Sequence, residues 1–292
     1  MAPMTGVTDL HGFVRYPEPM APLAADLSAA YGARLAGRAP QDGRDWAALP
    51  VQYADYTLWH RQMLGDPADP ASRHARQMAF WTETLADLPE QIQLPTDRNR
   101  ATTPTYRGQT LTLTLPDALS ARLNAAAAER GITLFMLLQA GVAALLRRMG
   151  AGTDIALGSP IAGRVEPGLE NLVGVFVNTI VTRVDLSGDP SLDTLLTRLR
   201  AANLAAYDHQ DVPFEELVER LNPTRSLSHH PLFQVMLAVQ QGRPEGAALQ
   251  GLATRERDAS GAVARFDLSL HLWEMPDGIE AELEYATDLF TG

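Results

Sequence analysis

The sequence predicts an α/β fold built around a mixed β-sheet, because helical and strand-like patterns alternate along most of its length. Thr110 to Leu115 reads TLTLTL, a strict alternation that is typical of a half-buried strand. From Ser191 to Leu199, by contrast, leucine recurs at spacings of three and four residues, as it does along one face of a helix. No internal repeat of fixed period accompanies this alternation.

Composition excludes several classes of function. The 292 residues are 46% apolar and 20% charged, a balance typical of a globular protein with a substantial core. A net charge of −11 argues against nucleic acid or an anionic membrane as the main partner. The absence of cysteine excludes disulfides, thiolate metal sites and cysteine nucleophiles.

No targeting or membrane segment is evident in the sequence. The residues after Met1 lack the charged-then-apolar layout of a signal peptide. The longest apolar helical stretch, Leu134 to Leu146, is too short to span a bilayer and is interrupted by Gln139. We therefore expect a cytoplasmic protein with no membrane partner.

The first hundred residues predict helices. Residues 1–19 have no sustained period, whereas a helical pattern begins at Met20 and ends near Gly37. Further helices are expected within Leu49–Leu64 and Ser72–Leu88. The polar stretch Leu94–Gly108, which contains two prolines, indicates a linker.

The remaining residues predict an alternation of strands and helices. After the TLTLTL strand, helices are expected over Pro116–Arg130 and from the N-cap Thr133 to about Gly150. A short helix within His209–Leu221 is expected to begin at Pro213. The other expected strands are Asp154–Pro160, Gly174–Leu186, Leu232–Gln240, Ala264–Trp273 and Ile279–Phe290.

Common catalytic and ligand-binding motifs are absent. The seven histidines form no HExxH and no zinc-ligand spacing, so no metal site is predicted. The stretch GSPIAG (158–163) is not a GxSxG nucleophile elbow, because its serine directly follows the first glycine. Neither a Walker loop nor GxGxxG occurs, which leaves nucleotide binding without support.

Four stretches in order carry a resemblance to one family. YADYTLW (53–59) matches a YxDYAxW signature with Thr57 in the alanine slot, and LVGVFVNTIVTR (172–183) is similar to IGxFVNTLxxR. HQDVPFE (209–215) matches HQDxPFE at every position, and RSLSHHPLFQ (225–234) is similar to RDxSRxPLFQ. These are motifs of nonribosomal peptide synthetase condensation domains, which the chain resembles from about Met20 to Phe290. The matching residues are Tyr53, Asp55, Trp59, Gly174, Phe176, Val177, Thr179, His209, Gln210, Asp211, Pro213, Phe214, Glu215 and Arg225.

The resemblance implies a chloramphenicol-acetyltransferase-like architecture of two α/β lobes with a tunnel between them. Peptidyl and aminoacyl carrier proteins would be the partners, beside neighbouring synthetase domains. Substrates would be carried on the phosphopantetheine arms of these carrier proteins, with no cofactor bound by the domain itself. Residues 1–19 would lie outside the family, residues 20–98 would be a helical remnant of the N-terminal lobe, and residues 99–292 would form the C-terminal lobe.

The family's catalytic signature, HHxxxDG, is missing from its expected place just before Met20. His11 is the only histidine there, and His229-His230 belongs to the PLFQ motif instead. No catalytic residue is therefore assigned. We expect a truncated or frame-shifted gene, an excised fragment, or a lineage that shed its chemistry, and we expect the chain alone to form amide bonds poorly or not at all. The alternative is a non-catalytic module that docks a carrier protein or a tailoring enzyme; a stand-alone acyltransferase ranks last.

Two residues are candidates for the tunnel or its support. The resemblance implies that Arg164 pairs with the aspartate of HHxxxDG; without that partner it needs another carboxylate or exposure to water, because a buried unpaired charge is costly. A solvated arginine is the alternative. Asn178 is polar within an apolar strand, so it either faces the substrate tunnel or is a core asparagine with its hydrogen bonds satisfied.

The remaining motif residues favour structural roles. His209, Asp211 and Glu215 could form a catalytic cluster, but we favour a loop in which Asp211 caps the next helix and Phe214 packs inward. Tyr53, Tyr56 and Trp59 are expected in core packing rather than on a ligand, and Arg225 either faces a carrier protein or lies in a solvated loop.

Overall fold

The computed structural model describes residues 20–41, 44–221, 228–243, 249–252 and 263–292. The chain divides into two compact units, each assembled from three stretches of sequence. Unit 1 comprises Met1–Met63, Ala162–Val177 and Arg243–Gly261. Unit 2 comprises Leu64–Ile161, Asn178–Gly242 and Ala262–Gly292.

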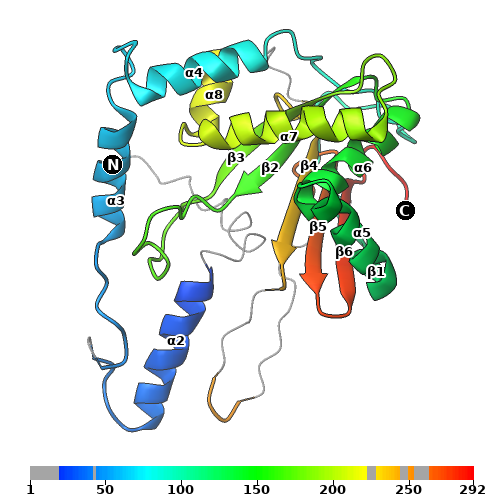
Figure 1. The fold of residues 1–292 in the computed structure, drawn as a ribbon. Helices are drawn as coiled ribbons and strands as arrows, with labels where there is room; N and C mark the ends of the chain where they lie inside the picture. Colours follow the sequence, from blue (N-terminus) through cyan, green and yellow to red (C-terminus); the bar gives the residue numbers. More distant parts are fainter. Residues whose placement is uncertain (1–19, 42–43, 222–227, 244–248, 253–262) are drawn as a thin grey trace. The chain divides into compact units, whose positions relative to one another are not determined.

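Unit 2 is built on a six-stranded mixed sheet with the order β1-β6-β5-β4-β2-β3 (Figure 1). β4 is parallel to both β2 and β5, while β1–β6, β5–β6 and β2–β3 are antiparallel. The predicted α/β class with a mixed sheet is confirmed. The strands are β1 Gly108–Pro116, β2 Asp154–Ile161, β3 Asn178–Asp185, β4 Val235–Gln241, β5 Leu268–Met275 and β6 Gly278–Ala286.

Helices α5, α6 and α7 cover one face of this sheet (Figure 1). The sequence sets their starts: the Thr133 hydroxyl accepts from the Met136 N–H at the start of α6, and the Ser191 hydroxyl accepts from the Thr194 N–H at the start of α7. Both predicted helices are confirmed. The helices of unit 2 are α4 Arg73–Thr84, α5 Asp117–Glu129, α6 Leu134–Arg148, α7 Leu192–Asp208 and α8 Phe214–Leu221.

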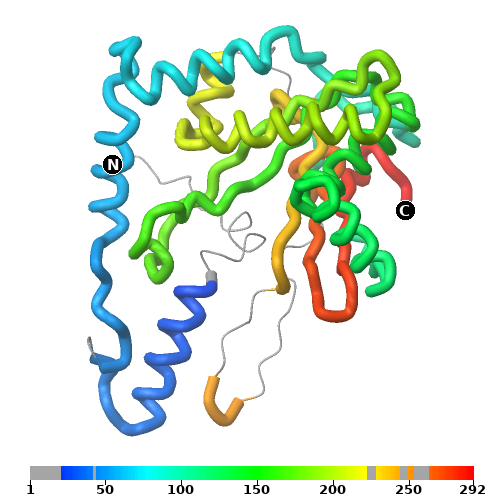
Figure 2. Tube along the Cα trace, in the orientation of Figure 1, coloured from blue at the N-terminus to red at the C-terminus, as the bar shows by residue number. Residues whose placement is uncertain are grey.

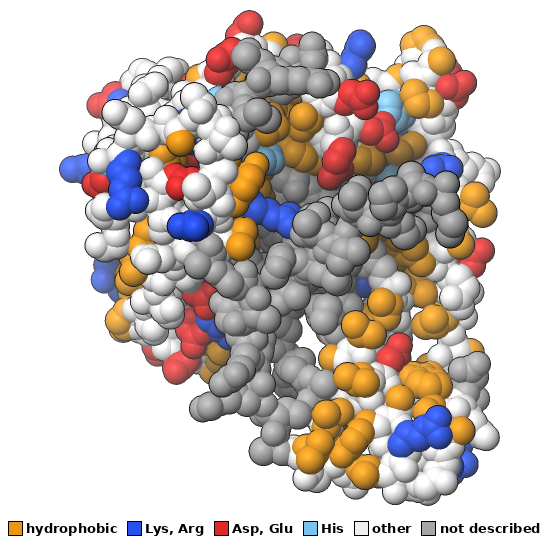
Figure 3. All heavy atoms as spheres, turned by 180° about the vertical axis from the view of Figure 1, so that it is seen from behind, with side chains coloured by type: hydrophobic (Ala, Val, Ile, Leu, Met, Phe, Trp, Pro, Cys, Tyr) orange, Lys and Arg blue, Asp and Glu red, His pale blue; other side chains and the backbone are white. Residues whose placement is uncertain are grey.

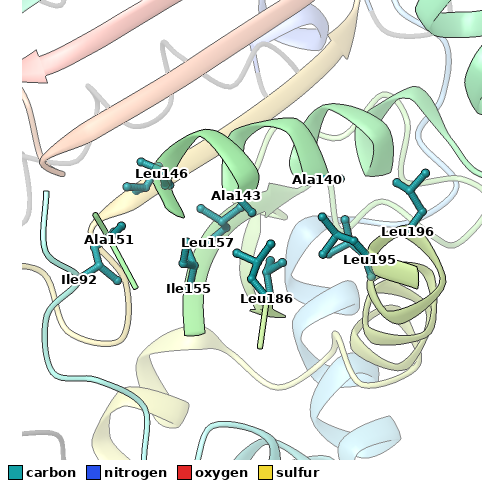
Figure 4. Close-up of a cluster of buried hydrophobic side chains, with 13 residues drawn as sticks. Ile92, Ala140, Ala143, Leu146, Ala151, Ile155, Leu157, Leu186, Leu195 and Leu196 are labelled. Carbon is teal, nitrogen blue, oxygen red and sulfur yellow. The ribbon is translucent and has the colours of Figure 1, made fainter. Parts of the chain in front are cut away.

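The main core of unit 2 lies between α6, α7 and the sheet. Figure 4 shows side chains of these elements pointing toward one another, with Ala143 of α6 and Ile155 and Leu157 of β2 each 0% exposed. Complete burial of a leucine or isoleucine side chain stabilises the fold by about 1.5–3 kcal/mol. The leucines that recur after Ser191 place Leu195 and Leu199 in this core, as their spacing predicts.

Unit 1 contains α2 (Met20–Leu35) and nearly all of α3 (Tyr53–Leu64). Only the last residue of α3, Leu64, belongs to unit 2. A small apolar cluster joins Val51 and Tyr56 to residues 169–176. Two leucines of α2 are exposed, Leu23 to 45% and Leu27 to 55%, whereas Ala33 is buried. Figure 3 shows apolar side chains gathered at the end of the view where α2 lies.

Two expectations about local structure are corrected, and the bounds of one expected helix become narrower. The strand predicted over Gly174–Leu186 begins only at β3, because residues 174–177 form a loop that packs on Tyr53. The helix expected within Leu49–Leu64 starts at Tyr53. The TLTLTL strand is not half-buried: β1 lies at the edge of the sheet, where Leu111 and Leu113 are 47% and 53% exposed.

Within the described ranges, no single helix is long and apolar enough to cross a membrane. The pair α5 and α6 reaches the required length and composition only when taken together, across a bend of 104°.

Candidate functional site

The HQDVPFE segment of unit 2 leads from α7 into α8, and α8 lies next to α4 (Figure 2). His209 is the C-cap residue of α7, where its backbone N–H donates to the carbonyl of Ala206. Pro213 directly precedes α8, and its carbonyl accepts from the N–H of Glu216 at 3.1 Å. A proline at this position costs the helix no hydrogen bond, as the sequence predicts.

Side chains of α4 hold this segment in place. The Gln77 side-chain oxygen accepts from the backbone N–H of Asp211 (3.0 Å) and of Val212 (3.1 Å). The Gln77 side-chain nitrogen donates to the Asp211 carboxylate at 2.6 Å. The Trp81 indole donates to the carbonyl of His209 at 2.7 Å. Because Gln77 and Trp81 are 2% and 3% exposed, these bonds are shielded from competing water.

The Asp211 carboxylate is bound to α4 rather than to the start of α8. It accepts from Arg73 Nε at 2.8 Å as well as from Gln77. The expectation that Asp211 caps the following helix is therefore wrong. The Arg73 side chain is 47% exposed, so the ion pair itself adds little stability, and the buried amide of Gln77 is the stronger contact.

Asn178 takes over the capping role and makes all four hydrogen bonds that an amide side chain can make. Its nitrogen donates to the carbonyls of Gln210 and Val212, each at 2.9 Å. Its oxygen accepts from the N–H of Thr179 (2.9 Å) and from the N–H of Phe214 (3.0 Å), the first residue of α8. This geometry supports the satisfied asparagine over a side chain kept available for substrate. It also links the FVNT and HQDVPFE motifs directly.

His209 is fixed by packing as well as by hydrogen bonding. Its ring stacks on Phe80 with 3.9 Å between centroids, and Nδ1 donates to the carbonyl of Ala205 at 2.7 Å. Phe214 packs inward as expected, with its ring 5.8 Å from that of His230, whereas Glu215 is exposed. These contacts support the structural interpretation of HQDVPFE over a catalytic cluster.

In unit 1, the YADYTLW motif packs against the loop that precedes β3. The Tyr53 hydroxyl donates to the carbonyl of Val175 at 2.8 Å, and its ring meets Phe176 edge-on at 5.3 Å. A Cβ on Gly174 would overlap the Tyr53 ring, which explains the glycine. Asp55 accepts from the N–H of Gln52 at 2.8 Å at the start of α3.

The expected core packing of the aromatic residues of α3 is only partly observed. Tyr56 belongs to the cluster with Leu169, Leu172 and Phe176. Tyr53 is 36% exposed and Trp59 is 40% exposed. The two outer rings thus lie at the surface of unit 1.

Arg164 folds back onto its own loop. Its guanidinium donates to the carbonyl of Leu169 and, at 2.8 Å, to that of Leu172. It also lies 4.2 Å from the centroid of the Phe176 ring, a cation–π distance. Arg164 therefore closes the 164–176 loop of unit 1 around Phe176.

Unit 2 has a cavity of about 200 Å³ beside residues 228–231 of the PLFQ motif. Arg100 and Asp267 line it and form a two-pronged ion pair. His230 also lines it, with Nδ1 donating to the carbonyl of Pro231 at 2.7 Å. Burial lowers the pKa of His230 to about 4, so the ring is neutral at pH 7.

The lowered pKa of His230 predicts a pH-dependent stability. The unfolded chain takes up this proton near pH 6.5, whereas the folded chain resists it until about pH 4, so stability falls as the pH falls through that interval. Between pH 7 and pH 5 the loss from this group is about 2 kcal/mol. Urea unfolding at both pH values should show that His230→Phe loses about 2 kcal/mol less than the unchanged protein. Equal losses would contradict the assignment to His230.

Sequence reasoning missed the α4 side of the site. Gln77 and Trp81 are four residues apart and therefore share a helix face, which is the only signal in the sequence. The Arg100–Asp267 pair carried no signal, since 167 residues separate its members. Arg225 and residues 1–19 lie outside the described residues. Across the described ranges, no three His, Asp or Glu side chains are grouped to hold a metal ion.

Comparison with known families and proteins gives consistent matches. The model of the family described as Condensation domain matches residues 23–292. The nonribosomal peptide synthetase CymA of Salinispora arenicola is 50% identical over 287 residues, 96% of this chain and 4% of that protein. A dimodular nonribosomal peptide synthase of Bacillus subtilis is 50% identical over 277 residues, 93% of this chain and 12% of that protein. The chain thus spans a small part of these relatives.

Solved structures show the same fold. The X-domain from teicoplanin biosynthesis has a TM-score of 0.85 at 37% identity, covering 94% of this chain and 62% of that one. The X-domain has also been solved in complex with OxyB from the same biosynthesis, with a TM-score of 0.84. The condensation domain of the Monacolin K polyketide synthase MokA has a TM-score of 0.73 at 17% identity, a likeness of fold alone.

Proposed function

Since the chain belongs to the condensation-domain family of nonribosomal peptide synthetases, we propose that it forms part of such a domain and supplies its scaffold rather than its acid–base chemistry. The family joins a thioester donor to an aminoacyl acceptor through an amide bond. Residues 20–98 would then be a helical remnant of the N-terminal lobe and residues 99–292 the C-terminal lobe, with residues 1–19 outside the family.

The observation that carries this proposal is that the side chains of the motif residues are already engaged in hydrogen bonds and packing within the protein. Asn178 uses all four of its hydrogen bonds on backbone groups, and the Asp211 carboxylate is bound by Arg73 and Gln77. His209 is stacked on Phe80. Side chains engaged in this way hold a loop and are poorly placed to accept a substrate proton.

The chemistry of amide formation explains why a scaffold alone is insufficient. The acceptor ammonium has a pKa of about 8, so attack on a thioester needs a free amine and a group that takes its proton. General-base assistance is typically worth about 10²–10⁴-fold. The 292 residues contain no HHxxxDG, the motif to which the family's base belongs.

The proposed partners are peptidyl and aminoacyl carrier proteins and the neighbouring domains of a synthetase. The substrates would be delivered on the phosphopantetheine arms of those carriers. Support comes from the relatives, which are synthetases many times longer than this chain.

A turnover assay tests the proposal. The purified chain is mixed with a donor-loaded and an acceptor-loaded carrier protein, and amide product is followed by mass spectrometry. We expect no product above the rate of the carriers alone, while an intact condensation domain assayed in parallel turns over. Product formed by the chain at the rate of that intact domain would overturn the proposal.

A second candidate function is a non-catalytic docking module for a carrier protein or a tailoring enzyme. The observation that favours it is the 37% identity and TM-score of 0.85 to an X-domain, a type of domain that has been solved with OxyB bound. Calorimetric titration of the chain with a phosphopantetheinylated carrier protein and with a tailoring enzyme separates the two partners. Saturable binding without turnover supports docking, and the absence of binding to both excludes it.

A further inference from the structure

Strand β1 is one of the two edge strands of the six-stranded sheet in unit 2. Among the described residues, it pairs along its whole length with β6 only, and a single bridge from Arg107 to Val263 lies before its first residue. Every residue from Thr110 to Thr114 is exposed. An edge of this kind presents backbone donors and acceptors to any strand that can reach it.

The register shows which groups point outward. The carbonyl of Arg107 accepts from the N–H of Thr287 at 2.9 Å, which makes Arg107 and Thr287 a hydrogen-bonded pair. Because such pairs alternate along an antiparallel ladder, the odd-numbered residues of β1 bond to β6. The N–H and C=O groups of Thr110, Thr112 and Thr114 therefore point away from β6.

Between its terminal residues, strand β1 itself carries none of the side chains that usually protect an exposed edge. Residues 109–115 contain no charge and no proline. The opposite edge of the same sheet, β3, carries Arg183 and Asp185, and Arg183 is ion-paired to Asp154 at 2.7 Å. Charged side chains and prolines are how natural sheets prevent edge-to-edge pairing, so β3 is protected and β1 is not.

We propose that β1 pairs with β1 of a second copy of this chain, antiparallel and about a two-fold axis at Thr112. The sequence from Thr110 to Thr114 is a palindrome, TLTLT, so this pairing places each residue against its own kind. Leu111 faces Leu113 of the second copy in a non-hydrogen-bonded pair, where side chains are closest. Thr112 faces its own counterpart, and the two exchange both backbone hydrogen bonds. A two-fold interface requires this self-complementarity.

Charge is compatible with the pairing. Within the described part of the sheet, the carboxylates nearest to β1 are those of Glu280, Glu282 and Glu284 of β6, which lie opposite the three threonines in register. In the dimer, two such rows are separated by three strand spacings, about 14 Å. That distance exceeds the Debye length of about 8 Å at physiological ionic strength, so the rows are largely screened. The net charge of −11 on each copy still opposes association, and added salt should therefore strengthen the dimer.

Sedimentation equilibrium of the full chain tests the association. The expected result is a concentration-dependent rise from 31.7 kDa toward twice that mass, with tighter association at higher salt. Thr112→Lys places two like charges at the two-fold axis and should weaken the dimer about tenfold or more. Thr197→Lys, at an exposed position of α7, adds the same charge elsewhere and should leave the dimer intact. A chain that stays monomeric at high micromolar concentration, or a dimer indifferent to Thr112→Lys, would overturn the proposal.

Single cysteines test the register, because the natural chain has none. In the proposed dimer, the Cα atoms of the two Thr112 residues lie about 5.5 Å apart, within disulfide range. The two Thr114 residues lie about 14 Å apart. Under mild oxidation, Thr112→Cys should form a covalent dimer rapidly and Thr114→Cys should not. Equal rates of covalent dimer formation for the two variants would exclude this pairing. If β1 associates with a strand of a different protein instead, neither variant should form a covalent dimer. Far-ultraviolet circular dichroism confirms that each variant is folded.

Discussion

Replacing Gly163 with alanine is expected to cost unit 1 about 3–4 kcal/mol, more than a typical substitution in this chain. Gly163 has a φ of +68°, a backbone conformation that costs free energy for residues other than glycine. A Cβ at this position would also overlap the backbone carbonyl oxygen of Phe176. A backbone atom cannot rotate away as a side chain does, so the loop closed by Arg164 must shift.

Gly37 provides a matched control for that loss. Its φ of +72° is almost the same, it belongs to the same unit, and a Cβ there meets nothing within 4 Å. Gly37→Ala should therefore lower the free energy of unfolding only by the conformational cost of about 1 kcal/mol. Hydrogen exchange over residues 162–177 and chemical unfolding measure the difference. Equal losses for the two variants would show that the overlap with Phe176 is relieved without strain.

Asn178→Ala is expected to destabilise unit 2 by about 2–4 kcal/mol. The substitution leaves the carbonyls of Gln210 and Val212 and the N–H of Phe214 without their partner. It also removes the cap of α8, which alone is worth about 1 kcal/mol. We expect faster hydrogen exchange throughout residues 209–217 and a lower denaturation midpoint.

Two further variants sharpen this test. Asn171→Ala alters an exposed asparagine of unit 1 and should be close to neutral. Asn178→Asp keeps the acceptor for Phe214 but loses both donors, and it places a carboxylate against two carbonyl oxygens. Its loss should be at least as large as that of the alanine variant. If Asn178→Ala matched Asn171→Ala in stability, the proposed link between the FVNT and HQDVPFE motifs would be wrong.

The positions of helices and strands could be predicted from the sequence more accurately than their burial in the fold. Caps such as Thr133 and Ser191 act within three residues, so local reasoning located the helices α6 and α7. The burial of β1 depends instead on its place in the sheet, which no local pattern specifies. Strict alternation fits an edge strand as well as an inner one, and Leu111 and Leu113 are exposed for that reason.

The candidate site was harder to predict because its contacts are long-range. Asp211 has a sequence context typical of an N-cap, but Gln77, 134 residues earlier, competes for its carboxylate. Asn178 could be read in two ways until its partners, 32 to 36 residues later, were known. A motif predicts that a loop is constrained, whereas only the fold shows which side chains constrain it.

The discontinuous make-up of unit 1 has a consequence for how the protein is made. The Tyr53 hydroxyl bonds to a carbonyl 122 residues later, and the apolar cluster around Tyr56 needs Phe176. At about 5–20 residues per second, a ribosome needs roughly 6–24 seconds to synthesise that intervening stretch. Throughout this interval the nascent chain exposes the aromatic residues of α3 without their later partners. Chaperones that bind apolar segments during translation therefore have a defined window in which to act on this chain.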